Sequence, residues 1–497
     1  EIGTGDWSSD VCLPISDGLA GCFIDGTWHW PASGETLPVE NPSRRSVICE
    51  VGRGTSVEVD LAVAAAERAR RDWAARPAAE RGAMLTELSN RLIANAEDVA
   101  RILAAESGNA IRTQSRGEAM GAAGVLKYFG GVAGEQKGET LPFGPGLMSY
   151  STREPLGVVG SIIPWNSPLQ LGAVKISMAL ATGNCLVLKP AEDAPLAVLK
   201  LVEMAADIFP PGVFNVVTGL GEEAGAALAT HPGVAKVSFT GSSEVGKLVA
   251  HAAADRIANV TLELGGKSPC IIFPDACTPE HIEATAQGVV NAMRFARQGQ
   301  SCTAGSRLFV HASVWDELMP KVVAKAAAMK VGDALDEESD IGAVVNEERY
   351  SEICAYVAEA EAQGATFLVG ETPKATDQGF HPVPTILSGL DNSWRIAREE
   401  VFGPVLVAIP WEDEDEMIAK ANDTHYGLAA FIFARDVSTV TRVTRALDAG
   451  WVQVNQGGGQ IPGMSYGGIK QSGMGSEYSI EGALEAYTFR KCVTMAL

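Results

Sequence analysis

Short runs of β-branched residues alternate with longer windows of helical periodicity through residues 156–272, and this alternation limits the possible folds more than any other feature. The runs have strand length and the windows have helix length. Strands that alternate with helices imply right-handed crossovers and a parallel sheet covered on both faces. The expected strands are 158–163, 185–188, 213–217, 236–239 and 260–264, and the expected helices are 169–180, 195–208, 222–229 and 244–254.

A second series of the same kind occupies residues 279–455 and predicts a second α/β domain. A chain of 497 residues is too long for one ordinary core, so two or three domains are expected. Residues 57–107 are expected to be helical throughout, and the other expected helices are 114–129, 315–329, 347–363, 413–422, 436–448 and 480–486. The other expected strands are 147–152, 307–310, 405–409, 429–433, 451–454 and 487–494. A glycine-dense loop is expected at 456–475.

Charge and cysteine usage exclude several classes of partner. The net charge of −22 argues against nucleic acid or an anionic membrane, and no uncharged apolar run is long enough to span a bilayer. Nine cysteines without a CxxC pair fit free thiols in a reducing cytoplasm. Seven histidines show no HxxxH or HxH spacing, so no metal site is expected. We therefore expect a cytoplasmic protein with neither a nucleic-acid nor a membrane partner.

Cys302 lies in a glycine-flanked turn, 299–303, between a helical pattern and a strand pattern. Such a turn can expose a thiol and let the backbone approach a bound molecule. A free cysteine on its own is more often a small buried apolar residue. Its functional interpretation therefore depends on motifs elsewhere in the chain.

Two strand ends in the first domain carry groups suited to a dinucleotide, because ligands bind at the carboxyl ends of parallel strands. Segment 239–247 joins a strand, a glycine turn and a helix start, where Ser242 or Ser243 can cap the helix and free N–H groups suit a phosphate. Lys189 and Glu192 can bind ribose hydroxyls, and Glu192 would repel a 2′-phosphate, which favours NAD over NADP. Plain helix capping and a surface ion pair are the alternatives.

Two further strand ends carry a candidate base and a candidate oxyanion donor. Glu263 closes an apolar strand before two glycines, and burial would raise its pKa towards that of a usable general base. Asn166, held between two prolines, can donate its amide to a developing oxyanion. The alternatives are a carboxylate satisfied by backbone N–H groups and a turn asparagine bonded to its own backbone.

Together these groups meet the needs of covalent aldehyde oxidation. Cys302 as thiolate would add to the carbonyl, while Asn166 and the Cys302 backbone N–H would stabilise the alkoxide. A hydride would pass to the nicotinamide, and Glu263 would activate water to hydrolyse the thioester. The predicted reaction is NAD⁺-dependent oxidation of an aldehyde to a carboxylic acid.

The chain resembles the aldehyde dehydrogenase superfamily over nearly its full length. The resemblance implies a cysteine nucleophile at Cys302, a base at Glu263 and an oxyanion donor at Asn166. It also implies that Lys175 and Glu477 take part in proton transfer from the base. The matching stretches are 164–168, 189–192, 239–247, 262–269, 299–307, 399–404 and 466–473.

The same resemblance implies a domain plan and a set of contacts. We expect a Rossmann-like NAD-binding domain at 1–136 and 156–272, an α/β catalytic domain at 273–475, and a small β bridging element at 137–155 and 476–497 through which a homodimer or homotetramer forms. The residues expected to hold NAD are Ile163, Pro164, Trp165, Lys189, Pro190, Glu192, Gly221, Gly225, Phe239, Thr240, Gly241, Ser242, Ser243, Leu264 and Gly265, with Glu400 and Phe402 at the nicotinamide ribose. Those expected to contact the aldehyde are Ser167, Gln170, Val174, Ser301, Thr303, Gly457, Gly459 and Tyr466.

Departures from the family pattern bear on the substrate. Ser167 and Val174 stand where relatives acting on small aliphatic aldehydes often carry bulky aromatics, and a glycine run occupies 457–459. A wider funnel, and hence a bulky or aromatic aldehyde, is therefore predicted. Arg294 and Arg297 could instead anchor an acidic semialdehyde, although surface or interface pairing is the commoner role of such residues.

Two other functions are compatible with the fold. Relatives that transfer the acyl group to CoA lack the glutamate that Glu263 supplies, which argues against a CoA-acylating semialdehyde dehydrogenase. A non-catalytic protein on the same scaffold, as some lens proteins are, is disfavoured by the joint presence of Cys302, Glu263 and Asn166.

Overall fold

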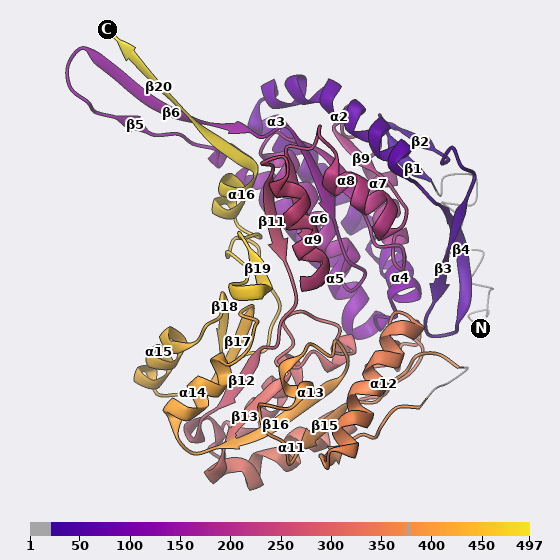
Figure 1. The fold of residues 1–497 in the computed structure, drawn as a ribbon, viewed down its shortest axis with the longest axis vertical. Coiled ribbons are helices and arrows are strands. Elements are labelled where there is room, and N and C mark those ends of the chain that lie inside the picture. Colours follow the sequence, from indigo (N-terminus) through magenta and orange to yellow (C-terminus); the bar gives the residue numbers. More distant parts are fainter. Residues whose placement is uncertain (1–20, 375–377) are drawn as a thin grey trace.

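The computed structural model describes residues 21–374 and 378–497, which form two stacked α/β units and a projecting β arm (Figure 1). The first twenty residues of the predicted NAD-binding domain, and with them Cys12, lie outside the described residues. The predicted α/β class with two sheets is confirmed.

The first sheet has eight strands and a reversal of strand order at its centre. The chain proceeds outward from β7 through β8 to β9 and then returns to place β10 and β11 on the other side of β7. The carboxyl ends of β7 and β10 therefore flank a switch point, where open α/β sheets bind ligands. The parallel strands are β7 (Val158–Ile162), β8 (Cys185–Lys189), β9 (Phe214–Val216), β10 (Lys236–Thr240) and β11 (Asn259–Glu263), and β1 (Cys22–Ile24), β2 (Thr27–His29) and β19 (Gly473–Met474) complete the edges in antiparallel pairing.

Helices cover this sheet, and the predicted helical stretch 57–107 is three of them. Pro77 separates the first two because proline lacks the N–H that a continuing helix needs. The helices are α2 (Ser56–Ala75), α3 (Ala78–Ala94), α4 (Ala96–Ser107), α5 (Arg116–Val132), α6 (Pro168–Ala181), α7 (Leu196–Ala205), α8 (Ala226–Thr230) and α9 (Ser243–Ala254), with π-helical turns η1 (Ile111–Ser115) and η3 (Gly221–Gly225) before α5 and α8.

The second sheet has seven strands, in the order β14-β15-β16-β13-β12-β17-β18, and only β14 is antiparallel to its neighbour. Its strands are β12 (Pro269–Ile272), β13 (Arg307–His311), β14 (Thr366–Val369), β15 (Thr385–Ser388), β16 (Val405–Trp411), β17 (Ala429–Phe433) and β18 (Trp451–Val454). Its helices are α10 (Ile282–Ala292), α11 (Trp315–Ala327), α12 (Glu347–Ala362), α13 (Arg395–Arg398), α14 (Glu414–Asn422) and α15 (Val437–Ala446). Short 3₁₀ turns occur in both units, at η2 (Ala133–Glu135) after α5 and at η4 (Pro274–Cys277), η5 (Phe295–Arg297), η6 (Ala312–Val314) and η7 (Lys470–Ser472).

The strand pairing moves both predicted boundaries of the second domain. Strand β12 pairs with β13 and β17 in the second sheet, although the prediction placed residues up to 272 in the first domain. Strand β19 pairs with β11 in the first sheet, although the prediction placed residues up to 475 in the second. Pairing partners are not encoded in the local apolar pattern, so a boundary between adjacent strands could not be read from it.

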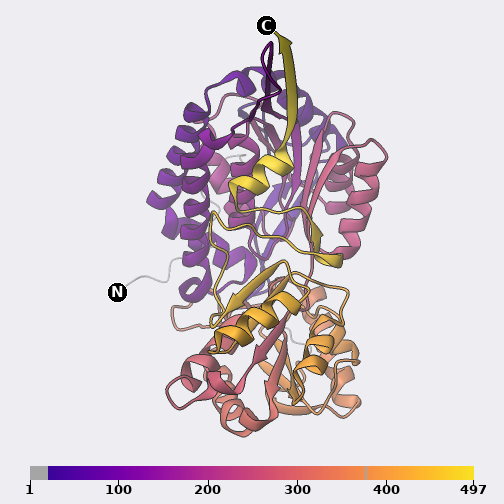
Figure 2. The ribbon, with the colours of Figure 1, turned by 90° about the vertical axis from the view of Figure 1, so that its left-hand side faces the viewer.

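The arm is a three-stranded antiparallel sheet formed by segments far apart in the chain (Figure 2). Strand β20 (Thr488–Ala496) pairs along β6 (Leu147–Pro155), and β5 (Thr140–Leu141) closes the other side. The helix α16 (Ile480–Tyr487) connects β20 to the body of the protein and lies against α6. A separate two-stranded sheet, β3 (Thr36–Asn41) with β4 (Ser46–Gly52), was not predicted.

Three further observations concern residues 21–374 and 378–497. No helix there is both long enough and apolar enough to cross a membrane. No group of three His, Cys, Asp or Glu side chains is arranged to hold a metal ion. The eight cysteines in these residues are all free thiols.

Candidate functional site

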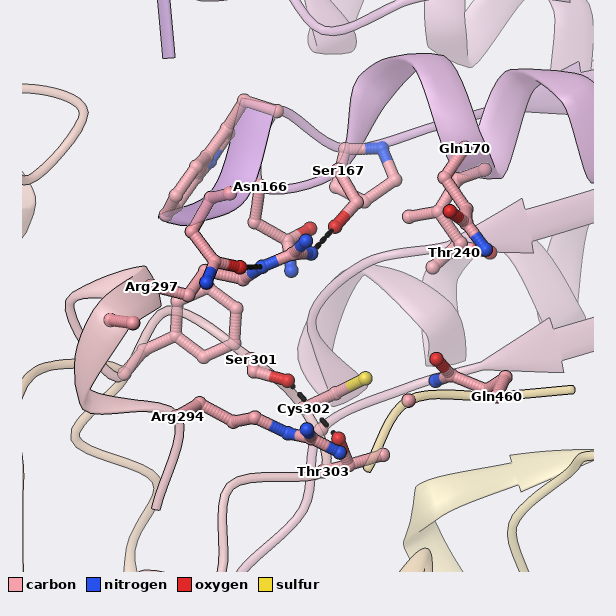
Figure 3. Close-up of a pocket in the computed structure, with 18 of the residues that line it drawn as sticks. Asn166, Ser167, Gln170, Thr240, Arg294, Arg297, Ser301, Cys302, Thr303 and Gln460 are labelled. Carbon is pink, nitrogen blue, oxygen red and sulfur yellow. Dashed lines mark hydrogen bonds between the residues drawn. The ribbon is translucent and has the colours of Figure 1, made fainter. Parts of the chain in front are cut away.

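A cavity of about 1200 Å³ opens where the two sheets face each other. The carboxyl ends of β7, β10 and β11 line one side of it, and the loop before β13 lines the other. Figure 3 shows part of this lining, with Cys302 between Ser301 and Thr303 and with Asn166 across the space. The fold thus gathers into one cavity the groups that the sequence distributes over more than 300 residues.

The turn that carries Cys302 depends on a glycine. Gly299 has a φ of +67°, and a Cβ there would lie 2.0 Å from the carbonyl oxygen of Gly403. Only glycine combines that backbone conformation with so close an approach. The partly buried Cys302 Sγ lies 3.5 Å from the hydroxyl of Tyr466.

The Cys302 thiol is protonated at neutral pH in this environment. Burial raises its pKa to about 11, although the hydrogen bond with Tyr466 and the nearby Arg294 guanidinium both lower it. The carboxylates of Glu400 and Glu263 add to the upward shift. A thiol of this kind becomes nucleophilic only when a base or a bound cation favours the thiolate.

Replacing Tyr466 by phenylalanine should slow alkylation of Cys302 by iodoacetamide about two- to fivefold at a fixed pH below the thiol pKa. In the native protein the hydrogen bond from Tyr466 lowers the pKa of the Cys302 thiol. Without that bond the pKa rises, and less of the cysteine is present as thiolate. Alkylation followed by intact-protein mass measurement checks this. Tyr350→Phe, which removes a hydroxyl bonded to the Lys374 carbonyl, serves as control, and an unchanged rate in Tyr466→Phe would contradict the assignment.

Glu263 ends β11 inside the cavity, with 4% of its surface exposed. Neither of its carboxyl oxygens has a hydrogen-bond partner among the described residues. Burial raises the pKa of Glu263 well above its ordinary value, the charge of Glu477 raises it further, and Lys175 partly offsets both. A carboxyl whose pKa is raised in this way is a stronger base in its ionised form than an ordinary glutamate, as a general base requires.

Two glycines after Glu263 let the end of β11 approach the cysteine loop. A Cβ on Gly265 would lie 2.3 Å from Glu400 Oε2, and one on Gly266 would lie 2.2 Å from the Cys302 carbonyl oxygen. Any side chain at either position would therefore displace the residues that line the cavity.

A buried polar network extends from Glu477, which lines the cavity near Glu263. Lys175 on α6 forms a fully buried ion pair with Glu477, and Ser238 Oγ donates to the same carboxylate at 3.3 Å. Thr261 Oγ1 donates to Ser238 at 3.1 Å, and Lys236 Nζ donates to Thr261 at 3.0 Å. The structure pairs Lys175 with Glu477, and their part in proton transfer stays a prediction. The position of Lys236 in this network was not predicted.

Asn166 lines the cavity but its amide is engaged. Its Nδ2 donates to the Gln300 backbone carbonyl at 3.0 Å, and the backbone carbonyl of Asn166 accepts from Asn109 Nδ2 at 3.2 Å. This bond to Gln300 holds the Asn166 amide on the cysteine loop, and the amide must exchange this partner before it can donate to a substrate oxygen.

The dinucleotide end of the cavity contains ten of the seventeen residues predicted to hold the cofactor. Glu192 accepts a hydrogen bond from Lys189 Nζ at 2.7 Å. Burial raises the pKa of Glu192, but the Lys189 charge and the hydrogen bonds that the carboxylate accepts together lower it by more. Ser242 caps α9 by accepting from Val245 N, whereas Ser243 donates to the Gln471 carbonyl. The lining residues are Pro164, Trp165, Glu192, Thr240, Gly241, Ser242, Leu264, Gly265, Glu400 and Phe402, and those not on the lining are Ile163, Lys189, Pro190, Gly221, Gly225, Phe239 and Ser243.

We define the substrate end as the lining residues contributed by η1, α5, the start of α6, α10, the loop 294–303 and the loop 457–460, together with Tyr466 and Tyr478. It differs from the prediction in two ways. Val174 is fully buried in the hydrophobic core rather than on the lining, because α6 has entered the core by that position. A Cβ on Gly457 would lie 2.5 Å from Ala292 N, so this glycine allows close packing on α10, whereas Gly459 faces open space.

The remaining predicted substrate contacts do line the cavity, together with residues for which the sequence offered no motif. Arg294 and Arg297 both line the cavity. The predicted contacts present are Ser167, Gln170, Ser301, Thr303, Gly457, Gly459 and Tyr466, and the additional polar ones are Gln114, Gln287, Asn291, Gln460 and Tyr478.

Comparison with known proteins gives consistent results over nearly the whole chain. The model of the aldehyde dehydrogenase family matches residues 28–493. A hydroxyisobutyraldehyde dehydrogenase of Mycolicibacterium austroafricanum is 40% identical over 94% of this chain and 92% of its own, and the cytosolic aldehyde dehydrogenase 1 of Rattus norvegicus is 39% identical over 96% and 94%. The solved structure of betaine aldehyde dehydrogenase from Staphylococcus aureus in complex with NAD⁺ matches with a TM-score of 0.93 and 35% identity, covering 99% of this chain and 97% of that one.

Proposed function

Because the chain belongs to the aldehyde dehydrogenase family, we propose that it oxidises an aldehyde to a carboxylic acid with NAD⁺ through a covalent intermediate on Cys302. The observation that carries this proposal is the placement of Cys302 and Glu263 on one cavity with a dinucleotide-type end. A panel of aliphatic, aromatic and acidic aldehydes, followed by NADH absorbance, tests it. Formation of NADH and acid in equal amounts is expected, and no turnover with any member, despite NAD⁺ binding, would refute it.

The protein groups supply the proton transfers and the covalent attachment. Cys302 Sγ adds to the aldehyde carbonyl after losing its proton, and the Cys302 backbone N–H with the Asn166 amide stabilises the oxyanion. Glu263 later accepts a proton from the water that hydrolyses the thioester. The ion pair of Glu477 with Lys175, and the effect of the Glu477 charge on the Glu263 pKa, support a role for this pair in proton transfer from Glu263. Relatives that transfer the acyl group to CoA lack this glutamate, so the presence of Glu263 disfavours acyl transfer to CoA.

The residues at the dinucleotide end fit NAD⁺. Glu192, which accepts from Lys189, suits ribose hydroxyls, the N-terminus of α9 at Ser242 suits a phosphate, and Glu400 with Phe402 suits the nicotinamide ribose. The absent Cβ of Gly265 leaves room beside Glu400. When bound there, NAD⁺ supplies the oxidising equivalent by accepting hydride from the substrate carbon.

Replacing Glu192 by serine should raise kcat/KM with NADP⁺ relative to NAD⁺ about tenfold or more. The carboxylate that repels a 2′-phosphate is removed, and Lys189 is left without its partner and free to bind that phosphate. Initial rates with both cofactors check this. The control is Glu203→Ser, which breaks the ion pair of Glu203 with Lys200 on α7, a Lys–Glu pair of the same spacing outside the cavity. It should leave the ratio of kcat/KM with NADP⁺ to that with NAD⁺ unchanged. An unchanged ratio in Glu192→Ser would contradict the assignment.

Substrate size, assembly and compartment follow from other features. The small Ser167 and the open Gly459 support a wide substrate end that admits bulky or aromatic aldehydes. The long exposed pairing of β6 with β20 supports assembly of a homodimer or homotetramer through the arm, the proposed bridging element. The free thiols in the described part of the chain, and a relative named as cytosolic, support a cytoplasmic location.

A further inference from the structure

Arg294 places a guanidinium at the substrate end with no acidic partner. It follows α10 with a φ of +61°, and its Nη1 and Nη2 donate to the carbonyls of Gly457, at 2.8 Å, and Gly458. No carboxylate of the described residues lies within ion-pairing distance of it. Burial lowers its pKa to about 10, so it still carries its charge at neutral pH. A cation in a poorly solvated site without a counter-charge is costly unless a ligand supplies the anion.

Arg297 adds a second guanidinium to the same end, and its compensation is weak. It donates to Gln114 Oε1 at 3.1 Å and to Ser167 Oγ, and it lies 3.6 Å from Glu118 Oε2. Burial raises the pKa of Glu118, which favours the neutral carboxyl, although Arg297 partly offsets this. The two guanidinium groups at the substrate end, those of Arg294 and Arg297, therefore have at most one carboxylate, that of Glu118, to balance their charge.

The other acidic residues of the cavity belong elsewhere. Asp340 is committed to Arg112 at 2.6 Å. The uncharged lining of the substrate end includes the aromatic Tyr466 and Tyr478, but it also contains several amide and hydroxyl side chains, which a purely apolar aldehyde does not require. The neutral ones are Gln114, Gln170, Gln287, Asn291, Ser301 and Gln460, and the acidic residues of the dinucleotide end and of the region behind Cys302 are Glu192, Asp193, Glu263, Glu348, Glu400 and Glu477.

We infer that the aldehyde oxidised at this site carries a carboxylate, and that Arg294 is the residue that binds it. This rests on the proposed function and names its substrate class, a semialdehyde in which the carboxylate and the reacting carbonyl belong to one molecule. Figure 3 shows the Arg294 side chain extended beside the loop of Ser301, Cys302 and Thr303, so one ligand can reach both the guanidinium and the thiol. A guanidinium suits this task because its fork of N–H donors matches a carboxylate.

The test compares an ω-carboxy aldehyde with its methyl ester, which has the same chain and lacks only the charge. Wild-type enzyme should have a kcat/KM for the acid about tenfold or more above that for the ester. Arg294→Gln should lower that acid-to-ester ratio about 10- to 100-fold, mainly through KM for the acid, and Arg294→Lys should restore part of it. Arg445→Gln, an equal charge change on the exposed face of α15, should leave the ratio at the wild-type value.

Three outcomes would overturn the inference. The ester could be preferred by the wild-type enzyme, the ratio could survive Arg294→Gln, or Arg294→Gln could lower both substrates equally while slowing iodoacetamide alkylation of Cys302. The last would assign Arg294 to stabilising the thiolate instead. The proposed function is judged separately, because it fails only if no aldehyde of either charge yields NADH.

Discussion

With Cys302 replaced by alanine, NADH production from the best aldehyde should fall on the order of 10⁴-fold or more, because the covalent route loses the atom that binds the substrate. Stopped-flow absorbance should show no pre-steady-state burst. The alanine leaves the dinucleotide end intact, so NAD⁺ titrated by quenching of protein fluorescence should bind as it does to the wild type.

The matched control for this result is Cys354→Ala. Cys354 is also a partly buried free thiol, but it lies on α12 and does not line the cavity. Its removal should keep turnover within about twofold of wild type, as for a substitution away from the site. NADH production by Cys302→Ala at a rate near that of Cys354→Ala would rule out the covalent mechanism.

With Glu263 replaced by glutamine, one NADH per active site should form in a burst, followed by steady-state turnover lowered about 10²- to 10⁴-fold. Both carboxyl oxygens of Glu263 lack partners, so the isosteric amide should fit without loss of a hydrogen bond. It cannot accept the proton of the hydrolytic water, and the acylated Cys302 should accumulate. Rapid quenching and intact-protein mass measurement would detect it.

The matched control and the pH dependence sharpen this prediction. Glu106 is another buried carboxyl, with a pKa raised by burial to about 8, but it accepts from the backbone at the start of α7 and lies off the cavity. Glu106→Gln should turn over without a burst. In the wild type, thioester hydrolysis requires deprotonated Glu263, so it should fail as pH falls through a pKa well above that of an ordinary glutamate. A burst-free, fully active Glu263→Gln would remove the residue from this role.

The sequence was a good guide to the layered fold and a poor one to which strands pair. Regular alternation predicted both parallel sheets, since a strand followed by a crossover helix has few alternatives. Strand β12 has the same apolar composition wherever it pairs, so its place in the second sheet depended on tertiary packing. The β3–β4 hairpin was not predicted because its sequence lacks the two-residue turn motif that identifies many hairpins.

The candidate site shows a similar division. Cys302 and Glu263 could be predicted as site residues because each has a local sequence signal, a glycine-flanked turn for Cys302 and a strand end followed by glycines for Glu263. The charge state of the substrate end could not be predicted in the same way, because it depends on which carboxylates come within reach of Arg294 and Arg297 after folding. Gly457 was expected to widen that end, yet its missing side chain serves the packing of a loop on α10.

The close approach of Gly266 to the Cys302 carbonyl has a consequence for how the molecule can move. The linker from β11 to β12 is one of the places where the chain passes from one sheet to the other, and Gly266 within it touches the loop that holds the sulfur. We therefore expect a shift of one sheet against the other at this linker to move the Cys302 loop as well.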